Sequence, residues 1–269
     1  MKRKRGLPLY TVPLTRHSAP QSGEKPVRFW LGFDRHHPES DPLVDQVAKD
    51  FIRDFKPTIR VAGGDWMCCD QCSTFDNESE FELKKEFEET NKALDDFKIT
   101  HYLEGNHEQR LRRVAGLVKK PLRSLCNLEA NLGLAKRKVQ FLPWHTTRGI
   151  LRLGHLKVLH GFYANEYVAR KTAEVYGTCA FGHTHRFQVF QPKAAFDTRV
   201  GFAIGMMGKL EQTYTGSRPP MGWAQGFAFG YIHSNGWFDL YPVRINAGRV
   251  TIEGKVYGTF TEDTEALVR

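Results

Sequence analysis

The sequence predicts an α/β fold in which two β-sheets pack face to face and helices cover them on the outside. Up to about residue 142, short apolar runs alternate with helical patterns, as in parallel strand–helix–strand units. After about residue 149 helical patterns become scarce, and apolar runs follow one another closely, as in a second, strand-rich sheet. With no internal repeat and no clear linker, residues 27–269 are expected to form a single domain, β-rich from about residue 187.

In the first half, apolar runs short enough for buried strands cover residues 27–33, 58–62, 99–103 and 139–142. Helical spacing of apolar residues fills two of the gaps. One helix starts at Pro42, after Asp41 as N-cap, and the other starts after a capping box at 79–82. A third, basic helical region follows residue 108. Residues 1–26 mix basic residues with prolines and show no sustained period, so we expect a flexible basic arm there.

The second half is expected to be mostly strands. Two runs around Gly154-His155 predict a hairpin, and Asn165 is expected to cap a helix that ends near Tyr176. A second hairpin is predicted around Asn246-Ala247-Gly248, between strands 243–245 and 250–252. The other predicted strands cover 178–181, 187–190, 200–204 and 228–232.

Charge is unevenly distributed along the chain, whose net charge is +9. Residues 39–104 carry 17 acidic and 8 basic residues, while residues 110–138 carry 9 basic residues and one acidic residue. This basic block and the basic arm 1–26 fit a nucleic acid or another phosphate-rich partner. The alternative, a solvated helix face, stays open.

The cysteines and the apolar runs indicate in which cellular compartment the protein is expected. Five cysteines are an odd number, and three of them crowd at Cys68, Cys69 and Cys72, so a reducing cytoplasm is expected rather than a disulfide scaffold. No apolar run is long enough to span a membrane. The basic start of the chain is followed by no apolar signal-peptide core, so secretion is not expected.

Five polar motifs follow apolar runs, where parallel strands present their carboxyl ends. They are Asp34-Arg35-His36, Gly64-Asp65, Gly105-Asn106-His107-Glu108, His160-Gly161 and Gly182-His183-Thr184-His185. Each motif alone is weak, but the ordered set supplies enough ligands for two metal ions that share one carboxylate. Such carboxylate and imidazole donors suit manganese, which we expect, and also iron, zinc or nickel. Two cations about 3.5–4 Å apart can activate a hydroxide and clamp a phosphoryl group.

These motifs, in this order, resemble those of the calcineurin-like metallophosphoesterases, from about Phe29 to Phe187. The resemblance implies a four-layer α/β/β/α fold, a β-sandwich flanked by helices. It also implies one role for each donor. Asp34, His36 and His185 would hold the first metal; Asn106, His160 and His183 would hold the second; Asp65 would bridge both, together with a hydroxide; and His107 would protonate the leaving oxygen or stabilise its charge.

The second motif departs from the family's usual Gly-Asp-x-x-Asp or Asn. Its last place is Cys68, with Asp70 two residues on. Reduced loop cysteines are the simplest interpretation of the cluster, and a thiol or zinc role is the alternative. Arg110 could reach a substrate phosphate, or it could be an ordinary surface arginine.

The predicted function is a metal-dependent phosphodiesterase acting on nucleic acid or a nucleotide. A phosphomonoesterase, including a protein or small-molecule phosphatase, is the alternative, because the same two-metal site serves both reactions. A catalytically dead binding module on the same fold is a third possibility. Aromatic residues of the C-terminal part could line a substrate cleft or pack in the core. They are Trp223, Phe227, Phe229, Tyr231, Trp237, Phe238 and Tyr241.

Overall fold

A computed structural model describes residues 25–74, 82–193, 197–212 and 222–259 of the chain. Almost the whole arm 1–26, and residues 79–81 of the predicted capping box, lie outside the described residues. The described residues form a six-stranded sheet, a five-stranded sheet and a small β12–β13 hairpin (Val250–Ile252 and Lys255–Tyr257).

The six-stranded sheet joins the first part of the chain to its C-terminal part. Its strand order is β11 (Phe238–Ile245), β10 (Gln225–Ile232), β1 (Val27–Gly32), β2 (Ile59–Ala62), β3 (His101–Leu103) and β4 (Gln140–Leu142). β1 to β4 run parallel, as the sequence predicts, with Leu31 opposite Val61 and Leu103 opposite Leu142. β10 pairs antiparallel with β1. The carboxyl ends of β1 to β4 therefore lie along one edge of the sheet.

The five-stranded sheet is built from the middle of the chain. Its strand order is β5 (Leu151–Leu153), β6 (Leu156–Leu159), β7 (Cys179–Phe181), β9 (Gly201–Ile204) and β8 (Phe187–Phe190). β5 and β6 form the predicted antiparallel hairpin, and β6, β7 and β9 run parallel. The polar residues that follow β6 and β7 therefore leave this sheet at the same edge.

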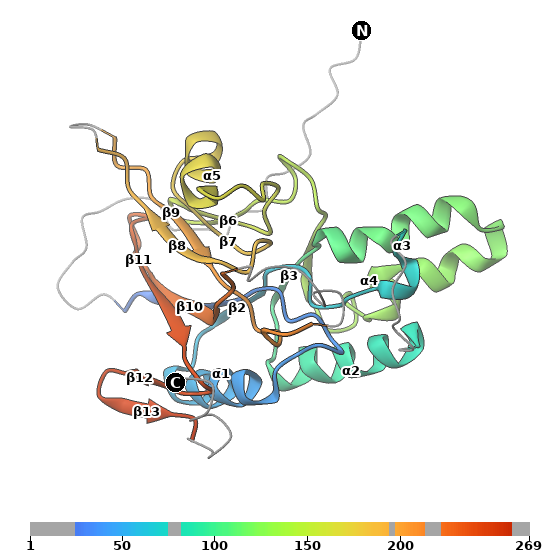
Figure 1. Cartoon of the computed structure of the whole chain (residues 1–269), viewed down its shortest axis with the longest axis horizontal. Helices are drawn as coiled ribbons and strands as arrows, with labels where there is room; N and C mark the ends of the chain where they lie inside the picture. The colour runs from blue at the N-terminus through green and yellow to red at the C-terminus, as the bar shows by residue number, and fades with distance from the viewer. Residues whose placement is uncertain (1–24, 75–81, 194–196, 213–221, 260–269) are drawn as a thin grey trace, which may run out of the picture.

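The side chains of β1 alternate between two cores, as expected for a strand buried on both faces. Phe29 and Leu31 lie in the core between the two sheets, while Trp30 packs on the other face with Phe51 of helix α1 (Pro42–Phe55). A third core lies between the second sheet and helix α5 (Val168–Tyr176). Figure 1 shows α5 on one side of the paired sheets, and α1 with α2 (Leu83–Asp96) on the other. The four-layer α/β/β/α prediction is confirmed.

Asp41 caps α1 as predicted, because its carboxylate accepts hydrogen bonds from the backbone N–H groups of Leu43 (2.9 Å) and Val44 (3.3 Å). The basic block forms an arm that projects from the sheets (Figure 1). It contains α3 (Asn106–Leu117), the 3₁₀-helix η2 (Lys120–Cys126) and the short α4 (Leu128–Asn131). A further 3₁₀ turn, η1 (Asp70–Cys72), lies in the cysteine loop.

One local prediction is wrong, and another is only partly right. Asn165 does not cap α5, because that helix begins after Tyr167. The turn predicted around Asn246-Ala247-Gly248 forms, because Asn246 and Arg249 exchange two backbone hydrogen bonds of 3.1 Å across it. The strands predicted on either side do not pair with each other, since 243–245 is the end of β11 and pairs with β10, whereas 250–252 pairs with β13. In both cases pairing with distant strands and helices outweighs the local signal.

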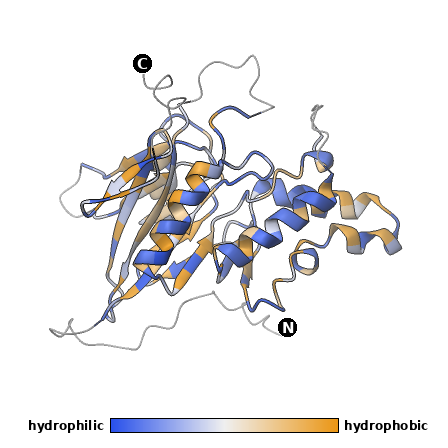
Figure 2. Ribbon diagram, turned by 90° about the horizontal axis from the view of Figure 1, so that it is seen from below, coloured by the Kyte–Doolittle hydropathy of each residue, from blue (hydrophilic) through white to orange (hydrophobic). Residues whose placement is uncertain are grey.

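In Figure 2 the helices carry hydrophilic residues along one side and hydrophobic residues along the other. This is the pattern of helices that cover a core from outside. In the part of the chain that the structure describes, no helix is both long and apolar enough to cross a membrane.

Candidate metal centre

The predicted ligand residues all leave the carboxyl ends of core strands. Asp34 and His36 follow β1, Asp65 follows β2, and Asn106 opens α3 just after β3. From the second sheet, His160 follows β6, and His183 and His185 follow β7. Residues about 150 positions apart in the chain are thereby brought into contact at one edge of the sandwich.

Glycines let these loops approach one another closely. A Cβ atom on Gly105 would stand 2.1 Å from Asp65 Oδ1, and a Cβ atom on Gly182 would stand 2.1 Å from Asp34 Oδ2. Any larger residue at either place would push a carboxylate out of the site. Five predicted ligands, by contrast, are non-glycine residues with positive φ angles between 49° and 71°. They are Asp34, His36, Asp65, His183 and His185. Such backbone strain gathers at functional sites.

The first cluster consists of Asp34, His36 and His185, all buried. His36 Nε2 lies 2.9 Å from His185 Nε2, and Asp34 Oδ1 lies 3.9 Å and 3.6 Å from these two nitrogens. Ligand atoms that stand about 2.1 Å from one ion are separated by about 2.9–4.2 Å from one another. The three donor atoms therefore fit around one metal ion.

The second cluster consists of Asn106, Asp65, His160 and His183. Asn106 Oδ1 lies 3.1 Å from His160 Nε2 and 2.7 Å from His183 Nδ1. Asp65 Oδ2 lies 3.2 Å from His160 Nε2. The 3.1 Å and 3.2 Å separations suit ligands of one ion, and the 2.7 Å separation is slightly shorter than that range.

Asp65 links the two clusters. Its carboxylate belongs to a group with His160 and His183, and also to a group with His36 and His107. The backbone N–H of His107 donates a 2.8 Å hydrogen bond to Asp65 Oδ1, which leaves Oδ2 directed at the imidazoles. A carboxylate in this position can contact two ions, as the sequence predicts for Asp65.

His107 lies beside the clusters with its ring orientation fixed. Its Nδ1–H donates to the backbone carbonyl of Cys68 (2.9 Å), so Nε2 faces the site, 3.9 Å from Asp65 Oδ2. The side chain is 12% exposed. His107 is also close enough to His36 and Asp65 to be grouped with them as a possible ligand. The predicted acid role and a ligand role both require Nε2 in this position.

Burial makes most of the imidazoles suitable for metal binding. It lowers the pKa of His36 well below its usual value, that of His183 to about 4 and that of His185 to about 3. These rings are therefore neutral at pH 7 and can offer a lone pair. Burial alone would lower the pKa of His160, but the Asp65 carboxylate raises it to about 9. A metal ion at this position would displace that proton.

The two aspartates respond differently to the same burial. Burial raises the pKa of Asp34 well above its usual value. Burial also acts to raise the pKa of Asp65, but His160 and His107 outweigh it and hold that pKa well below the usual range. A divalent cation would favour the ionised form of both carboxylates. The donors present therefore fit a pair of divalent ions.

Glu108 organises the site, although the sequence assigns it no role. Its buried carboxylate accepts hydrogen bonds from the backbone N–H groups of Asp65, Trp66, Met67 and Gly105 and from the Tyr102 hydroxyl, at 2.7 to 3.1 Å. Burial raises its pKa to about 7, and donors such as Tyr102 oppose that rise. Glu108 thus ties the loop after β2 to the start of α3. Its place in the Gly-Asn-His-Glu motif is the one signal that could have identified it.

Cys68 occupies the place where the family's second motif usually has a carboxylate or amide. Its backbone carbonyl accepts from His107 and, at 2.8 Å, from Arg110 Nη1. Its thiol donates to the carbonyl of His36 (3.3 Å), and burial raises its pKa well above the usual value. The neutral thiol is therefore a packing group. All five cysteines are free.

Arg110 is held at the edge of the site rather than extended into solvent. Asp70 accepts a 2.9 Å hydrogen bond from Arg110 Nη1. Arg110 Nη2 lies 3.3 Å from His107 Nε2. The predicted substrate-binding residue thus stands next to the predicted acid, anchored by a carboxylate.

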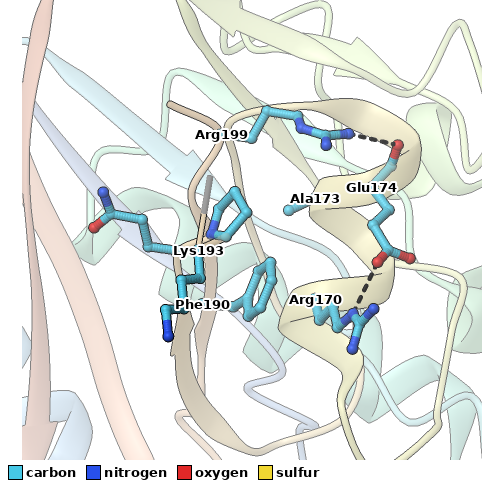
Figure 3. A pocket seen from close by; sticks show the side chains of 8 residues that line it. Arg170, Ala173, Glu174, Phe190, Lys193 and Arg199 are labelled. Carbon is cyan, nitrogen blue, oxygen red and sulfur yellow. Dashed lines mark hydrogen bonds and ion pairs between the residues drawn. The ribbon is translucent and has the colours of Figure 1, made fainter. Parts of the chain in front are cut away.

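A cavity of about 370 Å³ lies elsewhere, between α5 and the segment after β8 (Figure 3). Arg170 bonds to Glu174 beside it, and Arg199 bonds to Asp197 and to the carbonyl of Glu174. Phe190, the last residue of β8, lines this cavity, whereas His185 lies just before the start of β8. The cavity is therefore at the other end of the strand from the metal ligands. In the described residues, all three groups of potential metal ligands lie at the centre formed by the predicted residues.

No protein-family model matches the chain, and no curated protein matches it in sequence. Among solved structures, it is similar to Vacuolar Protein Sorting 29 from Cryptosporidium parvum (TM-score 0.44, 13% identity, over 88% of this chain and 97% of that chain). It is also similar to an archaeal phosphodiesterase (0.42, 10%, 81% and 100%) and to Yfce, a phosphoesterase from E. coli (0.37, 15%, 80% and 99%). With TM-scores below 0.5 and identities of 15% or less, these similarities support no argument about the chemistry of this chain. That argument rests on the residues of the site itself.

The resemblance to the calcineurin-like metallophosphoesterases is confirmed in the four-layer fold and in the gathered Asp and His side chains. Two neighbouring ligand clusters with a shared carboxylate, an imidazole and a guanidinium can bind metal ions and a phosphate group together.

Proposed function

We propose that this chain is a two-metal phosphoesterase that hydrolyses phosphodiester bonds, with nucleic acid or nucleotides as its substrates. The observation that carries the proposal is the pair of ligand clusters joined through Asp65, with His107 beside them. The chemistry of phosphoryl transfer needs charge neutralisation on the phosphoryl oxygens, a nucleophile and a proton for the leaving oxygen.

Each residue has a part in this proposal. Asp34, His36 and His185 would hold one ion, Asn106, His160 and His183 would hold the other, and Asp65 would be shared by both. When bound, two divalent ions supply Lewis acidity toward the phosphoryl oxygens and acidify bound water. Manganese is the proposed metal, because the donors mix carboxylate, amide and imidazole groups.

His107 and Arg110 act on the phosphate directly. His107 Nε2 protonates the leaving oxygen, and the hydrogen bond from Nδ1–H to Cys68 keeps the ring turned for it. The Arg110 guanidinium, fixed by Asp70, binds a phosphoryl oxygen. Burial lowers the pKa of His107, and Asp65 opposes this by raising it.

The projecting basic block, residues 110–138, supports a polyanionic substrate. Five of its basic residues are exposed and, within the described residues, form no ion pair closer than 4 Å with an acidic side chain. They are Lys119, Lys120, Arg123, Lys136 and Lys138. Others are already engaged: Arg112 pairs with Glu104, and Arg137 with Asp95. The arm starts at the residues that carry the metal centre, so its field would attract a nucleic acid toward the site. We also propose a reducing cytoplasm, where free cysteines persist.

The test is hydrolysis of bis-p-nitrophenyl phosphate against p-nitrophenyl phosphate by metal-stripped protein to which Mn²⁺ is added. The proposal predicts metal-dependent turnover and a higher kcat/KM for the diester. A higher value for the monoester would make the chain a phosphomonoesterase. No turnover of either compound by protein with both metals bound would favour a binding module.

A further inference from the structure

An aromatic ring stands directly beside the first ligand cluster. The ring centroid of Trp223 lies 4.5 Å from that of His185, with an interplanar angle of 69°. The backbone N–H of Ala224 donates a 2.8 Å hydrogen bond to the carbonyl of His185, and Met206 N–H donates to the carbonyl of Ala224 (3.0 Å). The segment that carries the indole is therefore tied to the ligand loop and to the end of β9.

Trp223 keeps part of its surface accessible. The residue is half-buried, unlike the fully buried Trp30 and Trp66 of the core. Its neighbour Gly222 is exposed, and a Cβ atom there would meet no described atom within 4 Å. The indole is therefore not fully buried in the core.

A row of contacts leads from Trp223 across the first cluster to Arg110. The His185 ring lies 4.8 Å from the His36 ring, and the His36 ring lies 4.7 Å from the His107 ring. Arg110 Nη2 is 3.3 Å from His107 Nε2. The series of contacts thus starts at an indole and ends at an anchored guanidinium, with metal ligands in between.

These two ends select different parts of a substrate. A guanidinium binds phosphate oxygens, whereas an indole face binds a flat aromatic group. Stacking of a nucleobase on an aromatic side chain contributes about 1–3 kcal/mol. A nucleoside phosphodiester carries both groups within a few bonds, and an alkyl or glycerol phosphodiester lacks the flat ring.

We propose that Trp223 forms a nucleobase subsite beside the cluster of Asp34, His36 and His185, so that the substrate is a nucleoside phosphodiester. The subsite rests on the phosphodiesterase function proposed above and names its substrate class. It accepts a base on a free dinucleotide or on a single strand, because stacking needs an unpaired face. In the same substrate, Arg110 binds the phosphate group.

The test compares two diesters that share one leaving group, thymidine 5′-(p-nitrophenyl phosphate) and methyl p-nitrophenyl phosphate. Wild-type protein with Mn²⁺ is expected to favour the thymidine ester. Trp223→Leu is expected to lower the ratio of kcat/KM for the thymidine ester to that for the methyl ester by about 5- to 100-fold. Trp223→Phe keeps an aromatic face and is expected to retain most of the ratio.

Trp237→Leu is the matched control. Trp237 also contacts a histidine edge-on, with its ring centroid 5.6 Å from that of His155. It lies in the turn before β11, next to the β5–β6 turn and thus at the opposite end of β6 from His160. The ratio is expected to stay at the wild-type value in this variant.

Binding and metal content provide readouts independent of turnover. Trp223→Leu is expected to keep two metal ions per chain and to bind thymidine 5′-monophosphate about 5- to 100-fold more weakly, by calorimetry. Equal losses on both diesters, or loss of metal in Trp223→Phe as well, would overturn the subsite and make Trp223 a packing partner of His185. A wild-type protein that cleaves both diesters equally would overturn the subsite and leave the phosphodiesterase intact. Cleavage of neither would overturn both proposals.

Discussion

The role of His107 depends on the orientation and protonation of one atom, Nε2. The hydrogen bond from its Nδ1–H to Cys68 fixes the tautomer in which Nε2 faces the ligands. In this position Nε2 of the doubly protonated ring can deliver a proton to a leaving oxygen, whereas Nε2 of the neutral ring can bind a metal ion next to His36 and Asp65. The two roles give different results when the ring is removed.

His107→Ala is expected to retain both metal ions and to slow turnover of diesters with poor leaving groups by about a hundredfold or more. The loss should be much smaller with p-nitrophenolate, which leaves readily without a proton. Measuring kcat over a series of leaving groups, together with metal content, tests this. Loss of one metal ion would instead assign His107 as a ligand, and equal losses over the series would rule out the acid role.

At single positions, the sequence indicates the donor residues but not their neighbours. Asp34, Asp65 and the histidines are recognisable because each follows an apolar run that becomes a buried strand. Glu108 and Trp223 are not, because three of the donors to Glu108 and the histidine beside Trp223 lie more than 30 residues away. No local pattern reports that five donors surround Glu108, or that one particular tryptophan lies against His185.

Among the elements, helix α2 is joined to the cysteine loop by a buried carboxylate. Glu86 accepts a 2.7 Å hydrogen bond from the backbone N–H of Cys69. Burial raises its pKa from the usual 4.5 to about 8. The folded protein therefore holds a proton that the unfolded chain releases between these values, so this group makes the protein less stable as pH rises from about 4.5 to 8.

Glu86→Gln removes this titration and keeps an oxygen that can accept from Cys69. The free energy of unfolding of the variant, relative to wild type, is expected to rise by about 1–3 kcal/mol between pH 5 and pH 8. Denaturant unfolding of metal-free protein at both pH values measures it. Glu88→Gln, at an exposed position two residues on, is the control and should show no such change. A constant difference between Glu86→Gln and wild type would contradict the account.

Element boundaries were predictable where a local signal and the tertiary structure agree. Asp41 and Pro42 start α1 as expected, and the Gly154-His155 turn joins β5 to β6. The turn at Asn246-Ala247-Gly248 also forms, yet the strands on either side of it pair with β10 and β13 rather than with each other. Leu117 has helical spacing but is 82% exposed on the projecting arm. Pairing with strands far away in the chain decided where β11 ends, and a short window of sequence carries no signal for such pairing.

For the whole molecule, the two-sheet fold could be predicted, but its strand order could not. The antiparallel pairing of β1 with β10 joins residues about 200 positions apart, and β9 lies between β7 and β8. The parallel order of β1 to β4 follows from their short helical connections and was predictable. That part of the fold aligns the strand ends and brings Asp34, Asp65 and Asn106 to one edge, where the second sheet adds the histidines.

The central claim is that the site binds two metal ions through a shared Asp65, and metal content per chain tests it most directly. After chelation and Mn²⁺ reloading, wild-type protein and Asp70→Asn, a nearby non-ligand control, are expected to hold two ions per chain by elemental analysis. Asp65→Ala is expected to hold none, because both clusters lose a ligand. Two ions retained in Asp65→Ala, or no more than one in wild type, would contradict the account.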